Sequence, residues 1–294
     1  MKNILTLLLV FLGSQMGSAQ LNVHLNIERD QYLAHEPVYA VVTITNRSGK
    51  TLELVSEQKG AIAHSWLDFS MRTSGGRPLP KLTNSVFQKA KIPAGQAVKR
   101  RVNLNQLFGV SRVNAYSVTA SVRQSGTESM AYSSNSAHFS VNGGIEVYRQ
   151  AFGVPNSRAS KREYRVLTFN DGRRTSIYAS VMNTVSGRSL STFRVSEALL
   201  FKRPQCAPDG KNRLHILYLA NPTIFVHAIV NQDGGMEKPS YIKVGASGDP
   251  RLVAFANGEV AVSGGIPYDP AKEAEARSKV RKATDRPQGA TRGR

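Results

Sequence analysis

The sequence predicts an all-β protein made of two tandem antiparallel β-sandwich-like domains, the first of them immunoglobulin-like. Three observations predict this fold class. Apolar and polar residues alternate with a period of two over short runs, which is the pattern of strands with one buried face. Clusters rich in Gly, Ser and Pro separate the runs. In the second half, a strand-rich unit recurs after about 50 residues.

Residues 1–19 have the organisation of a secretory signal peptide. Lys2 supplies a positive charge, residues 4–12 are apolar, and residues 17–19 are small. The apolar run is about half of the roughly 20 residues that a membrane helix needs. We therefore expect an exported chain, periplasmic or extracellular, without a membrane span. The single cysteine, Cys206, excludes an intramolecular disulfide, and it lies too deep in the chain for lipid attachment at a cleavage site.

Residues 20–141 are predicted to form the first sandwich, because short strand-like runs follow one another with turn residues between them. In the first run, Leu21, Val23, Leu25 and Ile27 alternate with polar residues. Two further apolar runs flank the turn cluster at 46–49, and we interpret them as a hairpin. The strand-like runs read LNVHLNIERD, EPVYAVVTITN, TLEL, SWLDFSMRT, AVKRRVNL, AYSVTASVRQ and AYSSNSAHFSV.

Two aromatic residues of this domain are predicted to be structural. Tyr116 opens a run in which Val118, Ala120 and Val122 alternate, as in the tyrosine corner of immunoglobulin-like sandwiches. Val118 stands where antibody domains carry a cysteine, so the domain is a disulfide-free relative at most. Trp66, the only tryptophan, lies in another strand-like run.

The segment IERDQYLAHEPVYAVVTITNRSGKTLEL resembles the opening of the immunoglobulin-like modules of exported bacterial proteins and of macroglobulin-type domains. His35 occupies a position where Gly is usual in those modules. The resemblance covers the first domain only and implies a fold without implying any chemistry. The matching residues are Tyr32, Glu36, Pro37, Val38, Asn46 and Ser48.

Residues 142–163 are punctuated by Gly and Pro and carry a charged cluster, which predicts a linker. Residues 164–268 form the second all-β domain. Its repeat aligns Val166 with Ile216, Ile177 with Ile224, and Val195 with Val244. Two units are too few for a closed propeller of about four to eight blades. An antiparallel meander folded into a second sandwich or an open barrel is the plainer interpretation, with propeller-like packing left as an alternative.

The chain has 39 Lys and Arg against 20 Asp and Glu, a formal net charge of +19. Such a field attracts anions in general, although a basic surface can also serve solubility alone. Residues 269–294 have scarcely any large apolar side chain and are predicted to be a disordered basic tail. The candidate anion-binding residues are Lys99, Arg100, Arg101, Lys279, Arg281 and Lys282. Basic residues interleaved with aromatics, typical of nucleic-acid binding, are missing from the sequence, so a nucleic-acid partner is not expected.

No catalytic, cofactor or metal site is predicted. The six histidines are scattered, and a closed metal site needs three or four clustered ligands. His215 and His227 lie on predicted strands and would approach each other if those strands pair. Cys206 lies in a Pro-bracketed loop near Arg203. A nearby positive charge can make a thiol reactive, but a packed, inert thiol is the commoner outcome.

These observations favour an exported, non-enzymatic binding or scaffold protein. Loops or strand edges of the sandwiches would bind another exported protein or an anionic surface polymer. The alternative is a glycan-active hydrolase with its site in the repeated second domain. A concavity in that domain lined by two acidic residues and an aromatic would favour the enzyme, and a filled core with flat faces would favour the binding protein.

Overall fold

The computed structural model describes residues 21–59, 62–124, 131–154, 157–246 and 248–283, and in these residues the fold is all-β with several antiparallel sheets. Residues 1–20, with the predicted signal peptide, lie outside this description. The chain divides into two compact units. The first contains the residues up to Asp30, then 38–110 and 114–140. The second contains 31–37, 111–113 and the residues from Val141 onward.

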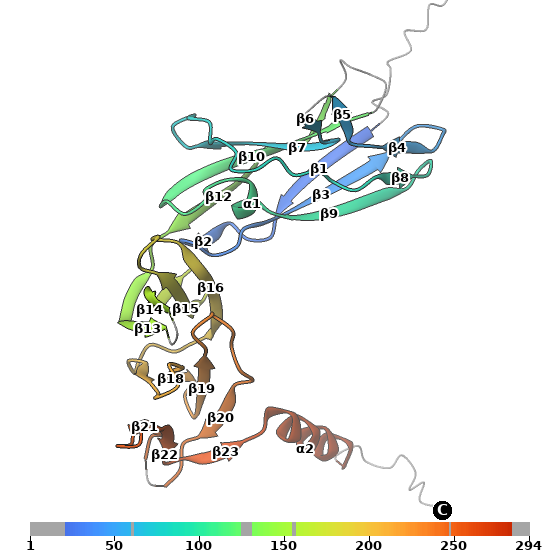
Figure 1. The fold of residues 1–294 in the computed structure, drawn as a ribbon. Helices are drawn as coiled ribbons and strands as arrows, with labels where there is room; N and C mark the ends of the chain where they lie inside the picture. Colours follow the sequence, from blue (N-terminus) through green and yellow to red (C-terminus); the bar gives the residue numbers. More distant parts are fainter. Residues whose placement is uncertain (1–20, 60–61, 125–130, 155–156, 247, 284–294) are drawn as a thin grey trace, which may run out of the picture. The chain divides into compact units, whose positions relative to one another are not determined.

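The helices and strands of the described residues follow one another as shown in Figure 1. In the first half they are β1 (Leu21–Ile27), β2 (Gln31–Leu33), β3 (Tyr39–Asn46), β4 (Leu52–Leu54), β5 (Glu57–Lys59), β6 (Ile62–His64), β7 (Leu67–Thr73), β8 (Ala90–Ile92), β9 (Ala97–Asn103), α1 (Leu104–Leu107), β10 (Asn114–Arg123), β11 (Ala131–Ser133) and β12 (Ala137–Asn142). In the second half they are β13 (Ile145–Val154), β14 (Ser157–Asn170), β15 (Thr175–Asn183), β16 (Ser189–Glu197), β17 (Gln205–Pro208), β18 (Leu214–Asn221), β19 (Ile224–Val230), β20 (Ser240–Lys243), β21 (Arg251–Ala254), β22 (Val260–Ser263), β23 (Ile266–Tyr268) and α2 (Pro270–Ala283).

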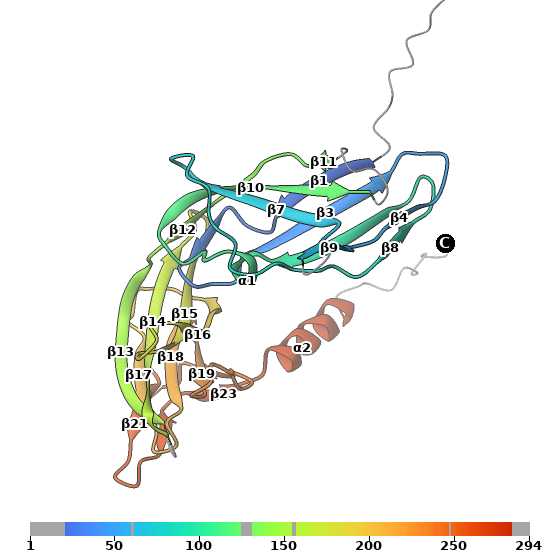
Figure 2. The ribbon, with the colours of Figure 1, turned by 45° about the horizontal axis from the view of Figure 1, so that its top comes forward.

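Two main sheets build the first unit. One has the order β1-β3-β9, and in the other β10 pairs with β7, β11 and β12 (Figure 2). Every second residue of β1 is buried, and the same alternation runs through β3 and β10. The period-two pattern of the sequence therefore marks the faces that form the core.

The predicted hairpin between the runs at 38–44 and 52–54 is wrong. β3 pairs with β1 and β9, whereas β4 pairs with β8, with Leu52 opposite Ile92. Asn46 explains this path: it is fully buried, and its Nδ2 donates to the Lys50 and Ile92 carbonyls at 2.7 and 2.9 Å. The turn is thereby attached to β8, so the chain after β3 leaves its sheet and cannot fold back on it.

Residues 31–37, which contain β2 and the turn after it, include Glu36 and His35 of the segment that resembles immunoglobulin-like modules. Glu36 is buried and its Oε2 accepts a hydrogen bond from the Leu33 backbone N–H at 3.0 Å, which holds the loop closed. His35 adopts a φ of 69°, in the left-handed region that favours glycine. A glycine at this position would adopt the same conformation without strain.

The predicted linker at 142–163 is not a linker. These residues include all of β13 and the first half of β14, which pair as a long antiparallel hairpin with Phe152 opposite Arg162. β13 is an edge strand, and many of its residues are exposed or half-buried on both faces. A strand of this kind has no clean alternation, so its sequence pattern resembles that of a loop.

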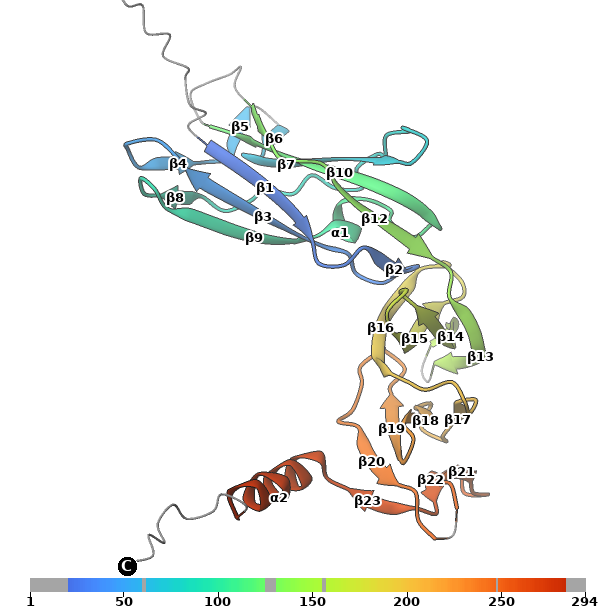
Figure 3. The ribbon, with the colours of Figure 1, turned by 180° about the vertical axis from the view of Figure 1, so that it is seen from behind.

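The second unit contains two consecutive meander sheets, β13-β14-β15-β16 and β17-β18-β19-β20-β23 (Figure 3). They share one hydrophobic core, which makes this unit a filled two-sheet packing and excludes a propeller blade arrangement. Buried residues of both sheets, with Ala198 directly after β16, form that core: Tyr164, Val166, Ile177, Ala179, Val181, Ala198, Leu214, Ile216, Tyr218, Val226, Ala228 and Val230.

The internal repeat has a structural counterpart with a corrected alignment. Val166 lies opposite Ala179 in the first sheet, and Ile216 lies opposite Ala228 in the second. Val166 and Ile216 are therefore equivalent, as the sequence predicts. The same register makes Ile177 equivalent to Val226, two residues from the predicted Ile224.

Residues 270–283 form helix α2, whereas the sequence predicted a disordered tail from 269 onward. Asp269 caps the helix, because its Oδ1 accepts from the Ala271 backbone N–H at 3.0 Å. Glu273 pairs with Arg277 and Glu275 with Lys279, each four residues apart. The prediction rested on composition, which indicates only whether a segment can bury apolar side chains. A helix cap and ion pairs four residues apart stabilise α2 through local interactions instead. Residues 284–294 lie outside the described residues.

Candidate functional site

A cavity of about 140 Å³ lies in the first unit between β7 and the segment at residues 81–88. The outer edge of β7 forms one wall. Arg123 N–H donates to the Trp66 carbonyl at 2.8 Å, in the same register that pairs β10 with β7. Since hydrogen-bonded pairs alternate along an antiparallel ladder, the backbone groups of Leu67 and Phe69 point to the edge away from β10.

The segment at 81–88 is held at its two ends. Leu82 N–H donates to the Leu107 carbonyl at 2.8 Å, and the Trp66 indole donates to the Gln88 carbonyl at 3.1 Å. The middle of the segment belongs to no strand. The cavity therefore occupies the space where a neighbouring strand would otherwise pair with β7.

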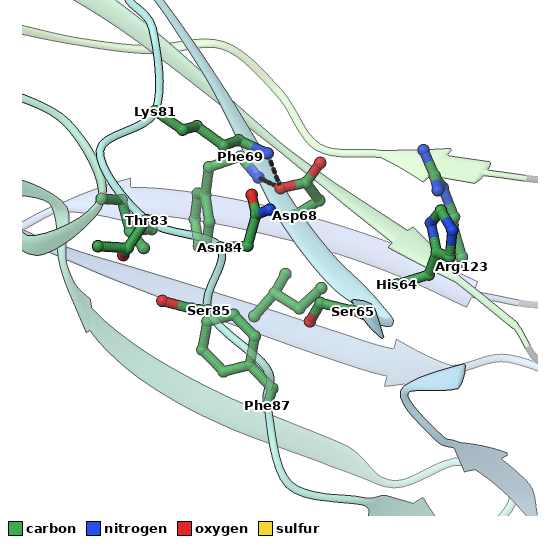
Figure 4. Close-up of a pocket in the computed structure, with 12 residues that line it drawn as sticks. His64, Ser65, Asp68, Phe69, Lys81, Thr83, Asn84, Ser85, Phe87 and Arg123 are labelled. Carbon is green, nitrogen blue, oxygen red and sulfur yellow. Dashed lines mark hydrogen bonds and ion pairs between the residues drawn. The ribbon is translucent and has the colours of Figure 1, made fainter. Parts of the chain in front are cut away.

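Polar and aromatic side chains line the cavity (Figure 4). Asp68 Oδ1 accepts the Phe69 backbone N–H at 2.8 Å and forms an ion pair with Lys81. Asn84 is exposed and Ser85 is half-buried, and the side chains of both make no hydrogen bond with residues that the structure describes. Phe69 and Phe87 supply the aromatic walls, with ring centroids 6.4 Å apart. No sequence motif predicts the residues that line this cavity, because they come from separate segments of the chain.

Ser65 also borders the cavity, and its hydroxyl is closed off from solvent without a hydrogen-bond partner among the described residues. A buried hydroxyl without a partner costs free energy relative to one in water. The packing behind this wall of the cavity is therefore not optimised for stability.

The two residues predicted to be structural are both buried. Trp66 packs against Phe87 at a centroid distance of 5.9 Å, so it supports the cavity wall from behind. Tyr116 stacks on Phe139 at 5.4 Å. Tyr116 also borders a second, more open cavity of about 590 Å³ in the first unit, together with Asp30, Arg72 and His138. The tyrosine-corner hydrogen bond stays a prediction.

The basic residues of β9 do not form one patch. Lys99 and Arg101 are exposed, whereas Arg100 between them is half-buried, because successive residues of a strand point to opposite faces. Arg101 Nε is 2.6 Å from Glu28 Oε1, and its guanidinium lies 3.3 Å from the ring centre of Tyr39. The guanidinium lowers the pKa of Glu28 below its usual value. Lys99 and Arg100 thus remain the cations of β9 without a carboxylate partner in the described residues.

The predicted anion-binding residues near the C-terminus lie within α2. Lys279 pairs with Glu275 at 2.7 Å. Arg281 and Lys282 belong to the last turn of the helix, but their side chains lie outside the described structure. The structure therefore does not bring these residues together with Lys99 and Arg100 into a described site.

The second unit contains a pair of histidines, buried His215 and half-buried His227, which meet as the sequence predicted if β18 and β19 pair. His215 Nδ1 and His227 Nε2 are 2.9 Å apart, and the rings stack at 5.1 Å. His215 Nε2 is 3.3 Å from Asp209 Oδ2, and Asp209 also accepts from Arg213 Nε at 2.7 Å. Since a carboxylate only accepts, His215 carries a proton on the Nε2 that faces Asp209, and one of the two facing nitrogens of the histidine pair donates to the other.

Burial dominates the electrostatics of this array. It lowers the pKa of His227 to about 4, helped by His215 and opposed by Glu237. Burial alone would raise the pKa of Asp209, but hydrogen bonds from Arg213, His215 and the Lys211 backbone outweigh it and lower that pKa. At neutral pH the array therefore contains an ionised Asp209 carboxylate and a neutral His227 imidazole.

Cys206 lies in strand β17, where the sequence predicted a loop, and packs against the core of the second unit. Burial raises the pKa of its thiol to about 12, although Arg203 acts in the opposite direction. The thiol stays protonated at neutral pH, and the thiolate is the reactive form. The structure thus describes a half-buried cysteine that packs against the core and is not an activated thiol.

Within the described residues, no group of three or more His, Cys, Asp or Glu side chains could hold a metal ion. Nor is any described helix long and apolar enough to cross a membrane.

Comparisons with known proteins add no family. No protein-family model matches the chain, and no curated protein matches it. Among solved structures, the chain is similar to Spo0M, a sporulation control protein from Bacillus subtilis, with 8% identity over 90% of this chain and 98% of that one. The TM-score of 0.26 is too low to relate the two folds.

Proposed function

We propose that this chain is an exported, non-enzymatic binding protein that attaches to a cell-surface polymer or to another exported protein through the loops and strand edges of its first unit. The cavity between β7 and residues 81–88 carries the proposal. It combines unengaged polar side chains with aromatic walls, which is the composition of ligand sites in general. The sandwich behind it supplies a rigid support.

Two further features support this function. The residues that resemble immunoglobulin-like modules stabilise the fold, as the contacts of Glu36 and Asn46 illustrate, and such modules expose their loops at the ends of a sandwich. The exposed apolar side chains of Leu82 and Val86 lie on the segment that borders the cavity. Exposed apolar residues next to a cavity favour contact with a partner.

A glycan-active hydrolase with its site in the second unit is the alternative. The observation in its favour is the array of Asp209, His215 and His227. However, Asp209 is engaged by Arg213 and His215, and Glu237 is engaged by Arg213 at 3.1 Å. These carboxylates stabilise the array and are not directed at a described cavity.

One experiment tests both functions. The mature full-length chain is incubated with an insoluble cell-wall polysaccharide fraction, and the pellet and the released reducing sugars are measured. Binding predicts that the chain sediments with the polymer without releasing sugar. A chain that stays in the supernatant at low and high salt contradicts polymer binding, and time-dependent sugar release would establish the hydrolase instead.

A further inference from the structure

We propose that the cavity between β7 and residues 81–88 binds one neutral sugar ring, either free or as a unit of a polymer. This inference rests on the proposed binding function and names the ligand class of the site. The argument uses the size of the cavity, the chemistry of its lining and the charge balance within it.

The size restricts the ligand. A volume of about 140 Å³ equals about four or five water molecules at roughly 30 Å³ each. It is also below the roughly 300 Å³ at which pockets for drug-sized ligands begin. One edge of a sugar ring with its hydroxyl groups can enter, and the rest of the ring and the neighbouring units of a polymer stay outside.

The lining contains both hydrogen-bond donors and hydrogen-bond acceptors, and a hydroxyl group of a ligand can use both. Asn84 presents an amide that donates and accepts, Ser85 presents a hydroxyl, and Asp68 retains acceptor capacity beside its bond to Lys81. Figure 4 shows Asn84 next to Asp68, and Ser65, Ser85 and Phe87 around the same space. The apolar C–H groups of a sugar ring can pack on the half-buried ring of Phe87, whereas Phe69 is only 3% exposed and supports that ring.

The charges beside Asn84 and Ser85 favour a neutral ring over an anion. Lys81 is already paired with Asp68, and Arg123, the other Lys or Arg of the lining, comes from the end of β10 and not from the segment that carries Asn84 and Ser85. An entering anion would meet the Asp68 carboxylate, and like charges at close range repel. A hydroxyl group instead donates to a carboxylate in a strong, charge-assisted hydrogen bond.

Saturation-transfer NMR on the mature full-length chain tests the proposal, with glucose and N-acetylglucosamine as separate probes. We expect transfer to the ring protons of at least one probe and a Kd of about 1 mM, corresponding to about −4 kcal/mol. Asn84→Ala and Ser85→Ala remove polar groups without internal partners. Each is expected to weaken binding about fivefold to tenfold, the loss of one hydrogen bond.

Ser70→Ala is the matched control, because Ser70 lies on β7 but is exposed and outside the cavity lining. It is expected to leave the Kd unchanged, and sodium sulfate at the concentration of the probe is expected not to displace the sugar. No transfer to either probe, equal binding by the Asn84→Ala, Ser85→Ala and wild-type chains, or displacement by sulfate would each overturn the proposal.

The outcomes also separate this inference from the proposed function. Sedimentation with the polymer in the absence of sugar binding means that the cavity is not the sugar site, although the chain is a polymer-binding protein. Sugar binding without sedimentation supports the cavity as a sugar site and contradicts attachment to that polymer.

Discussion

Acid should destabilise the second unit through its histidine pair, His215 and His227. The pKa of His227 is lowered from 6.5 to about 4 in the folded chain. The unfolded chain therefore binds the proton first as the pH falls. Stability from this residue is fully present above about pH 6.5 and is lost as the pH approaches 4. Protonation of both rings would also place two N–H donors against each other across 2.9 Å.

The magnitude follows from the shift. Each pH unit between the two pKa values changes the free energy of unfolding by up to about 1.4 kcal/mol, so the interval of about 2.5 units sets an upper limit of about 3.4 kcal/mol. His227 is partly accessible to water, which screens part of the effect. We expect a loss of about 1–2 kcal/mol between pH 7 and pH 4.5. Asp209 stays ionised there, because its pKa lies below the ordinary value.

Hydrogen exchange with peptides from β18 and β19 measures the stability of this unit separately. Trp66 is the only tryptophan and lies in the first unit, so its fluorescence reports the other unit. His227→Gln can still donate to His215 but does not titrate. The variant should lose about 1–2 kcal/mol less than the wild type over the same interval. His24→Gln, at an exposed position of β1, is the control and should behave as the wild type.

Equal pH dependence in the wild type and the His227→Gln variant would refute this reasoning. It would mean that solvent reaches the pair readily enough for His227 to titrate as it does in the unfolded chain. Greater stability of the wild type at pH 4.5 than at pH 7 would contradict the sign of the effect.

Four further changes test other parts of the structure. Asn46→Ala should destabilise the first unit by about 2–3 kcal/mol, because it leaves the Ile92 carbonyl and the turn without their partner; a change in urea midpoint near zero would contradict this role. Tyr116→Phe should cost about 1 kcal/mol if the tyrosine-corner hydrogen bond exists, and an unchanged unfolding curve would remove that assignment. Ser65→Ala should leave the melting temperature unchanged or raise it, since an unpartnered buried hydroxyl is removed; a clear decrease would show a hidden partner. Removal of residues 269–294 should weaken retention on heparin in a salt-dependent manner without changing the melting temperature. A variant neutralised at Lys99 and Arg100 is the surface control. Equal retention of the full-length and truncated chains at every salt concentration would exclude the tail as an anchor.

Much of the local fold could be predicted from the sequence. Alternation in β1, β3 and β10 identifies both the strands and their buried faces, because the period of a strand is a local property. The partners of the strands could not be predicted this way. β3 and β4 look like a hairpin, yet a buried side chain, Asn46, directs β4 to β8. The sequence does not predict β13 as a strand, because an edge strand exposed on both faces has no alternation of apolar and polar residues.

For the candidate sites, too, the sequence determined local properties, whereas the tertiary structure determined which residues meet. The sequence by itself determined that His215 and His227 lie on strands, that the chain is basic, and that a single cysteine excludes internal disulfides. Only the tertiary structure decided that the two imidazoles meet beside Asp209, that Arg101 is neutralised by Glu28, and that Asp68, Asn84 and Phe87 surround one cavity. Alternation along a strand specifies which side a residue faces. What it faces depends on the register of strands distant in sequence, which is set by the packing of the whole unit.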